Sequence, residues 1–268
     1  MSWQRKVGAV IVALVAVAAL LSLAWTPYDP LQTEVAARLQ GTSTTHWMGT
    51  DQFGRDILSR VMDGARLTLT VAVGAVGLSG LIGVPLGIWA GMRRGASRFV
   101  MAGADLLLAF PALLLAIIAG AVWGPSTLTA MAAIGIAGVP SFMRLARAGT
   151  LQVVHRDFIA AARLSRVSAP RIAVRHVLPN IAGILVVEAS VYFALAILAE
   201  AALSYLGLGT PPPAASWGRM LHDAQTHLST DPWLAVFPGA AIAVTVLGFN
   251  LLGDGLRDAL DTRLGRHA

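Results

Sequence analysis

The chain has 268 residues, of which 56% are hydrophobic and only 13% are charged, and its mean hydropathy is +0.69. A soluble protein of this length carries about 25% charged residues, so a soluble globular domain is excluded. The absence of cysteine excludes disulfides, thiolate metal sites and cysteine nucleophiles. The net charge of +6 comes mostly from arginines between apolar runs, a pattern that reflects membrane orientation and not nucleic-acid binding.

Six apolar runs approach or exceed the roughly 20 residues that a helix needs to cross hydrocarbon. In chain order they cover Val7–Trp25, Leu67–Met92, Phe99–Val122, Leu128–Met143, Ile181–Leu203 and Leu234–Leu252. Glycine and proline interrupt several of these runs, and in membranes such residues are common where helices pack closely. The sequence therefore predicts an all-α membrane protein with six spans.

The first run also resembles a signal peptide, because Arg5 and Lys6 precede it and Ser22-Leu23-Ala24 looks like a cleavage site. Its apolar core is longer than the roughly 7–15 residues of a signal core, which favours a retained span. Residues Thr26–Arg66 then form a long outer segment, expected to be mostly irregular and to end in an amphipathic stretch at Ile57–Met62. We divide the chain into residues 1–66, a helix with an outer segment, and a core of residues 67–268 with an inner loop at 144–178.

The basic residues predict the orientation of the spans. With the N-terminus inside, fifteen of the twenty Lys and Arg fall on the cytoplasmic side and five outside. This excess follows the positive-inside rule, so both termini are predicted to be cytoplasmic.

The chain lacks the residues of a nucleotide site. A P-loop needs a lysine after a glycine-rich turn, and the only lysine is Lys6, ahead of the first span. The hydrolase and zinc-protease motifs are also absent from the sequence. His222, Asp223 and His227 share one outer loop and could bind a metal, although a solvated loop is the favoured interpretation.

The inner loop shows a distinct helical pattern from Asp157. Asp157 is suited to cap a helix whose small face is expected to contain Phe158, Ala161, Ala162 and Ser165. Ser168 can cap a second helix with Pro170 in its first turn, and Pro179 is expected to break the pattern before the next span. Such a helix suits docking into a groove of another protein or lying on anionic lipid.

At this loop the chain resembles the membrane subunits of ABC importers. More narrowly, it resembles the C-type permease of the dipeptide/oligopeptide/nickel family, and the matching motifs extend from about residue 46 to the end. Four stretches carry the resemblance: Gly49–Asp56 with Gly64–Arg66, the loop Asp157–Asn180 that ends in Arg175–Asn180, Glu200–Gly209 with Pro212 and Ser216–Gly218, and Phe237–Gly239 with Phe249–Asp258.

The resemblance implies a type I ABC importer fold and several partners. These are a second homologous permease subunit, two cytoplasmic ATPase subunits that hold ATP and magnesium, and an extracytoplasmic binding protein, all at a bacterial inner membrane. No cofactor is expected in this chain, and it is not expected to be an enzyme. The residues implied to couple to the ATPase are Phe158, Ala160, Ala161, Ala162, Arg163, Arg166, Ser168, Leu178 and Pro179.

Two positions depart from the family motif. In the family this loop carries Glu-Ala-Ala, then Gly, then Leu-Pro. The glutamate of the motif falls on Ala160, so the bond with which it would have completed a capping box with Asp157 is lost. Its glycine falls on Arg166, where a left-handed backbone costs roughly 1 kcal/mol for a non-glycine residue. Either Arg166 accepts that strain or the first helix continues for another turn.

Polar residues in the apolar runs are candidates for the pathway. Glu188 is expected near mid-membrane, either lining the pathway or serving as a structural carboxylate. Asp105 lies nearer the cytoplasmic end, with a structural role favoured. Glu200, near the outer end of its helix, is expected to shape the surface that meets the binding protein.

The outer motif contains Gly49, Asp51, Gly54, Arg55 and Asp56. Its glycines and charges predict a turn in which the three charged residues form an ion-pair network, with structural bracing favoured over contact with the binding protein. Trp217 is expected to anchor the outer interface.

The favoured function is import of dipeptides or oligopeptides, driven by ATP hydrolysis on partner chains. One alternative is import of nickel or a metal chelate. Another is a stand-alone proton-coupled transporter, which would need a relay of ionisable groups such as Glu188 and Asp105.

Overall fold

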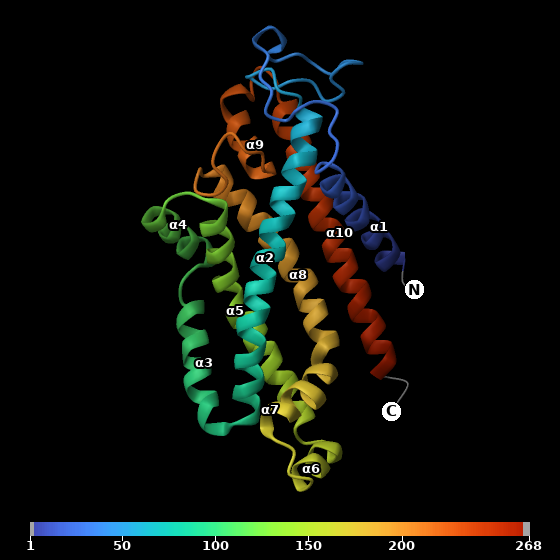
Figure 1. Cartoon of the computed structure of the whole chain (residues 1–268), viewed down its shortest axis with the longest axis vertical. Coiled ribbons are helices and arrows are strands. Elements are labelled where there is room, and N and C mark those ends of the chain that lie inside the picture. Colours follow the sequence, from blue (N-terminus) through green and yellow to red (C-terminus); the bar gives the residue numbers. More distant parts are fainter. Residues whose placement is uncertain (1–2, 265–268) are drawn as a thin grey trace.

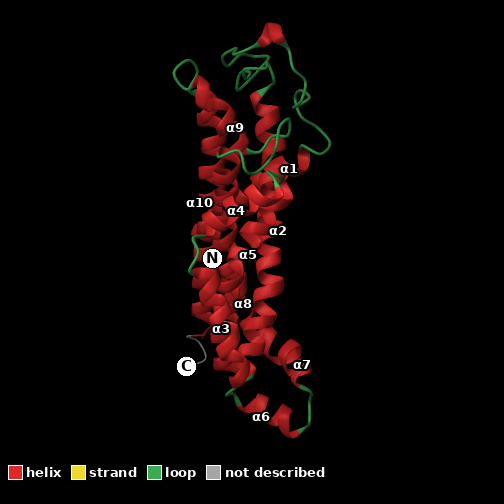
Figure 2. Ribbon diagram, turned by 90° about the vertical axis from the view of Figure 1, so that its left-hand side faces the viewer, coloured by secondary structure: helices red, strands yellow, loops and turns green. Residues whose placement is uncertain are grey.

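The computed structural model describes residues 3–264, apart from the side chains of residues 94, 96 and 260–264. Long helices run along a narrow bundle, and no strand occurs among these residues (Figure 2). The five longest helices are α1 (Trp3–Leu21), α2 (Ile57–Met92), α5 (Thr127–Val153), α8 (Leu178–Tyr205) and α10 (Trp233–Leu264). The segment 26–56 and the loop after α5 lie at opposite ends of the bundle, which we name the outer and the inner end after the orientation that the arginines predict (Figure 1).

Helix α2 starts ten residues before the predicted span. The Asp56 carboxylate accepts a hydrogen bond from the backbone N–H of Ser59, which caps the helix at Ile57. The amphipathic stretch predicted at Ile57–Met62 is helical and forms the start of α2, which continues through residues 63–66 although charged side chains lower the hydropathy there. At 1.5 Å per residue α2 is about 54 Å long, so it extends beyond a hydrocarbon core of about 30 Å.

The third predicted span, Phe99–Val122, is not one helix. It divides into α3 (Arg94–Leu108) and α4 (Ala112–Trp123), which meet at an angle of 78°. Pro111 precedes α4, and the residue before a proline avoids helical geometry, which explains the break. By length and composition, the described residues contain five single spans and this broken pair.

The centre of the bundle depends on a close approach of α2 to α5. A side chain added at Gly83 would place its Cβ 2.6 Å from the carbonyl oxygen of Val139, and at Gly87 only 2.3 Å from that of Met143. Only glycine allows the two backbones to be this close. The expectation that glycines in the spans mark helix contacts is confirmed here.

Helix α1 packs along α10 on one side of the bundle (Figure 1). At their contact, a Cβ on Gly8 would lie 2.5 Å from the backbone nitrogen of Leu252. The first apolar run is thus part of the packed bundle in this structure.

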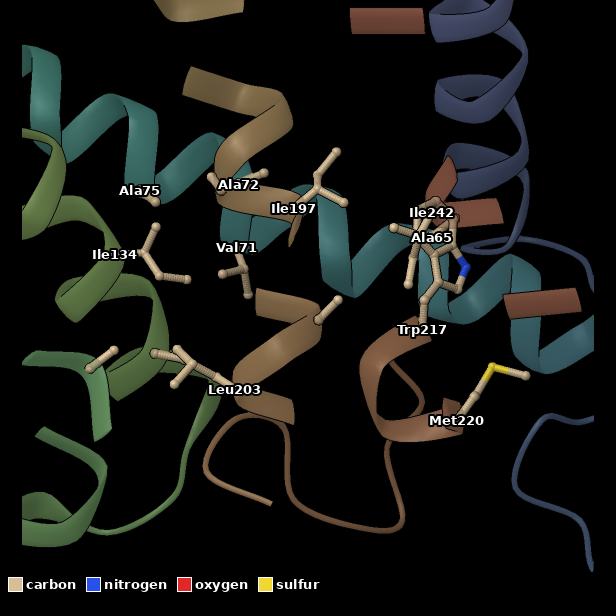
Figure 3. Packing of buried hydrophobic residues seen from close by; sticks show 14 of the residues in the cluster. Ala65, Val71, Ala72, Ala75, Ile134, Ile197, Leu203, Trp217, Met220 and Ile242 are labelled. Atoms are coloured by element: carbon tan, nitrogen blue, oxygen red, sulfur yellow. The ribbon is translucent and has the colours of Figure 1, made fainter. Parts of the chain in front are cut away.

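The outer half of the core is built around Trp217, the first residue of the short helix α9 (Trp217–Ala224). Its ring lies beside Ala65 and Ile242 (Figure 3) and its Nε1 donates to the carbonyl of Val61 at 2.9 Å. Only 1% of Trp217 is exposed. The prediction of an interfacial anchor is wrong, because the indole N–H finds its partner inside the protein.

Candidate functional site

The inner loop forms a short helix, α6 (Asp157–Leu164), at the end of the bundle opposite segment 26–56 (Figure 1). Helix α7 (Ala169–Ile172) and a π-helical turn, η2 (Ala173–Val177), follow it and lead into α8. Ile159 is fully buried and belongs to one apolar cluster with Ile88, Ile172 and Ile181. This cluster holds α6 against the inner ends of α2 and α8.

Apart from Ile159 and Ala162, the residues of α6 are exposed and partly apolar. Leu164 is 86% exposed and Phe158 is 43% exposed. Ala160, Ala161 and Arg163 are exposed as well. Of the predicted small face, Phe158, Ala161 and Ser165 are accessible, whereas Ala162 is buried against the bundle. An apolar tip on a firmly held helix is suited to contact with another protein.

Asp157 does not cap α6, so that prediction is wrong. The residue before the helix is Arg156, which has the extended backbone of an N-cap position (φ −80°, ψ 147°) and makes no side-chain cap. Asp157 is already the first helical residue, where its charge still interacts favourably with the helix dipole.

Arg166 ends α6 in the left-handed conformation, with φ of 55°. The backbone N–H of Val167 donates to the carbonyl of Ala162 at 3.1 Å, and that of Arg166 to the carbonyl of Arg163 at 3.0 Å. These two bonds form a Schellman motif, which is usually completed by glycine. Of the two expectations for Arg166, acceptance of the strain is the one observed.

The second half of the loop contains both prolines. Ser168 precedes α7 but its side chain makes no capping bond, and Pro170 lies in the first turn as predicted. Pro179 does not break the helix, in contrast to the prediction. The π-helical turn directly before α8 relieves the clash and the missing donor that a proline introduces, so the chain continues helically from Ala169 to Tyr205.

At the opposite end, five charged residues form a cluster that we call the outer brace: Asp51, Arg55, Arg60, Arg219 and Asp223. Arg55 Nε lies 2.6 Å from Asp51 Oδ2, and Arg60 Nε lies 3.6 Å from the same oxygen. Asp223 on α9 lies 2.8 Å from Arg219, 3.8 Å from Arg55 and 4.0 Å from Arg60. The brace therefore joins segment 26–56 and α2, through the buried Asp51, Arg55 and Arg60, to the partly buried Arg219 and Asp223 of α9.

The outer motif supplies the turn beneath this brace. Gly54 has φ of 77°, and a Cβ there would lie 1.8 Å from the carbonyl oxygen of Glu34. Gly49 likewise has a positive φ of 79°. The Asp51 carboxylate accepts from the backbone N–H groups of Phe53 and Arg55 at 2.8 and 3.0 Å.

The predicted network of Asp51, Arg55 and Asp56 is correct for the first two residues only. Asp56 accepts from both the N–H and the hydroxyl of Ser59 and lies 2.9 Å from His46 Nδ1, so its charge is used at the start of α2. Because the Asp56 carboxylate caps α2 through Ser59, it does not pair with the arginines of the brace.

The sequence does not reveal Arg60, Arg219 or Asp223 as members of this brace. Asp223, which the sequence offers with His222 and His227 as a metal alternative, pairs with arginines, and His222 Nδ1 lies 2.7 Å from the carbonyl of Tyr205. The closeness of Arg55 to Arg60 along the chain is the one signal that was available.

Glu200 is an internal link and not a surface residue. Its side chain is 1% exposed and accepts hydrogen bonds from Ser204 at 2.7 Å and Thr68 at 3.2 Å. These partners enclose the carboxylate between α8 and α2, so Glu200 is not itself part of a surface, and its expected influence on the side that meets a binding protein stays a prediction.

The two pathway candidates have different environments. Asp105 pairs with Arg144 at 2.6 Å, and both side chains are more than half exposed. Glu188 is half-buried on α8 and has no hydrogen bond or ion pair with any described residue. One turn further, Tyr192 donates to the carbonyl of Ile134 at 2.6 Å. No ion pair or hydrogen bond links Asp105 with Glu188 in the described part of the chain.

Comparison with known proteins gives consistent matches. Residues 83–266 match the family model described as "Binding-protein-dependent transport system inner membrane component". A dipeptide transport system permease protein of Alkalihalophilus pseudofirmus is 42% identical over 96% of this chain and 85% of its own length. A di/tripeptide permease of Pseudomonas aeruginosa is 38% identical over 97% of this chain and 89% of its own length. A glutathione permease of Pectobacterium atrosepticum is 42% identical over 89% of this chain and 80% of its own length.

The fold also has a solved relative. A structure of the MetNI methionine ABC transporter in an inward-facing conformation superposes with a TM-score of 0.62 at 16% identity, covering 74% of this chain and 95% of the other. The helical arrangement is thus that of an ABC importer permease. With the matches in sequence, this shows that the chain belongs to the family of inner-membrane components of binding-protein-dependent transport systems.

Proposed function

We propose that this chain forms half of a peptide importer in which two ATPase chains dock from the cytoplasm on α6. A second permease subunit completes the pathway, and a binding protein delivers a dipeptide or oligopeptide at the outer end. Both termini are then cytoplasmic, as the arginine distribution favours.

The observation that carries this proposal is the contrast within α6 between one buried anchor and an exposed apolar tip. Ile159 fixes the helix to the bundle, so a force applied at Leu164 and Phe158 reaches the inner ends of α2 and α8. An apolar residue that is 86% exposed at the tip of a held helix is stabilised when a partner covers it. ATP-driven movement of that partner can then reorient the spans.

The peptide substrate is supported by the names of the relatives, whose printed substrates are dipeptides, di/tripeptides and glutathione. Glu188, a half-buried carboxylate with no described partner, is a suitable contact for the amino group of a peptide. Asp105 is less suitable, because Arg144 already neutralises it.

Two alternatives are less well supported. A nickel importer would have the same coupling helix, so only the identity of the delivered ligand separates it from a peptide importer. A stand-alone proton-coupled transporter needs a relay of facing ionisable groups, and among the described residues Asp105 pairs with an arginine instead of with Glu188.

Deletion of Asp157–Ser168 tests the coupling. We expect the deleted protein to insert and to retain its outer brace, while substrate-stimulated ATP hydrolysis by the reconstituted transporter is lost. Undiminished stimulation in the deletion would refute the coupling role. Identification of the ligand on the co-purified binding protein by mass spectrometry tests the substrate, with a nickel chelate as the contrary result.

A further inference from the structure

A cavity of about 700 Å³ lies at the inner end of the bundle, between the last turns of α2 and the α7–η2 segment. Its walls are mostly apolar and include Ile88, Trp89, Pro170 and Val174. Sites for small ligands commonly measure roughly 300–1,000 Å³ and have apolar walls with a few polar groups. The size and the lining therefore suit a hydrocarbon chain or a molecule of similar bulk.

Two arginines, Arg93 and Arg163, line the same cavity. Neither side chain makes a hydrogen bond or ion pair with any residue that the structure describes. The surrounding segments are also poor in acid: residues 93–98 and 156–175 together contain eight arginines and one carboxylate, Asp157. Charge complementarity thus favours an anionic group beside the apolar walls.

The position of the cavity further restricts the class of ligand that could bind there. Trp89, which lines it, is 47% exposed, and half-exposed tryptophans are typical of the membrane–water interface. The inner end is the arginine-rich side, which under the proposed orientation faces the anionic leaflet. A ligand here has access to both hydrocarbon and headgroups.

We propose that this cavity binds an anionic phospholipid of the cytoplasmic leaflet. An acyl chain lies along Ile88 and Val174, and Arg93 and Arg163 hold the headgroup phosphate. Because the lipid would contact both α2 and the coupling loop, it would hold the loop in register with the spans.

The test uses the complete transporter, purified with its partner chains and examined by native mass spectrometry in the presence of dioleoyl phosphatidylglycerol or dioleoyl phosphatidylcholine. We expect the unchanged complex to retain phosphatidylglycerol preferentially. The double variant Arg93→Gln/Arg163→Gln should bind this lipid about 25-fold more weakly, at roughly fivefold for each arginine, and lose the preference. Ala169→Trp, which places bulk at the cavity, should reduce binding of both lipids.

The matched control is Arg98→Gln/Arg171→Gln, which removes the same charge from nearby exposed positions outside the cavity lining and should keep the preference. The proposal is overturned if the Arg93/Arg163 variant keeps the preference, or if the complex binds both lipids equally. It is also overturned if the complex binds no phosphatidylglycerol because a partner chain fills the cavity. If ATPase chains fail to co-purify with the unchanged permease, the proposed function fails. Because Arg163 lies on α6, their loss from the Arg93/Arg163 variant alone is expected to reflect docking, and in either case the same measurement on this chain alone tests the lipid site.

Discussion

The two ends of the bundle are built on opposite principles. At the outer end, Asp51, Arg60 and Asp223 bury their charges against one another, and Trp217 completes the core beside them. At the inner end, α6 is held by Ile159 alone among its larger side chains, while Leu164 projects outward.

This difference indicates that the outer end is stabilised by contacts within the chain, whereas the inner end is built to contact other molecules. The outer brace pairs every one of its charged side chains with an opposite charge of this chain, although Arg55 Nη2 and Arg219 Nε make no hydrogen bond with a described residue, and these pairs tie segment 26–56 to α2 and α9. The inner loop leaves apolar surface exposed and arginines unpaired, an arrangement that makes sense when other molecules cover it. Each of the following changes tests one side of this contrast, from the largest expected effect to the smallest.

Asp51→Ala should cause the largest loss of stability. It removes the nearer of the two carboxylates that face the buried Arg55 and Arg60 and leaves only the more distant Asp223, and breaking a buried ion pair from one side costs about 3–5 kcal/mol. The free energy of unfolding in detergent micelles measures the effect. Asp63→Ala is the control, because Asp63 pairs with the more exposed Arg66 and should cost less than about 1 kcal/mol. Equal losses in the two variants would show that the brace does not stabilise the outer end.

Ile159→Ala should release α6 from the bundle. Removing a fully buried isoleucine side chain costs about 2–5 kcal/mol, and here the cost falls on a local element. Hydrogen exchange of the α6 amides should therefore accelerate while exchange in α2 stays slow. Ile136→Ala, at a position 45% exposed on α5, should leave α6 unchanged. An unchanged α6 in the Ile159 variant would contradict its role as anchor.

Arg166→Gly should stabilise the end of α6 by about 1 kcal/mol, since glycine has no steric penalty at a φ of 55°. The readout is slower exchange of the Val167 amide, which donates to Ala162. Ser165→Gly, at a negative φ of −73°, serves as the control and should give no such gain. A loss of protection in Arg166→Gly would mean that the arginine side chain contributes more than its backbone costs.

Much of the fold could be predicted, because hydropathy places helices wherever a run is uniformly apolar. Prediction from hydropathy fails where tertiary contacts override the local composition of the chain. The outer turns of α2 contain Arg60, Asp63 and Arg66, which lower hydropathy, yet Arg60 is buried because Asp51 and Asp223 surround it.

The site was predictable to a similar degree. The left-handed residue at Arg166 and the turn at Gly49–Asp56 follow from local rules and could be anticipated. The partnership of Arg60 with Asp223 joins residues far apart in the chain, and the inward position of Trp217 depends on the carbonyl of Val61. Neither leaves a periodic signal in one sequence.

The most direct test of the account is the amount of ATPase chain that co-purifies with the permease when Leu164 is replaced by aspartate. Leu206→Asp is the matched control, since Leu206 is exposed at the other end of the bundle, just after α8. We predict at least a tenfold reduction for Leu164→Asp, from lost burial of one leucine, and no reduction for Leu206→Asp. Full recovery of the ATPase chains with Leu164→Asp would contradict the claim that the ATPase chains dock on α6 and move the spans through it.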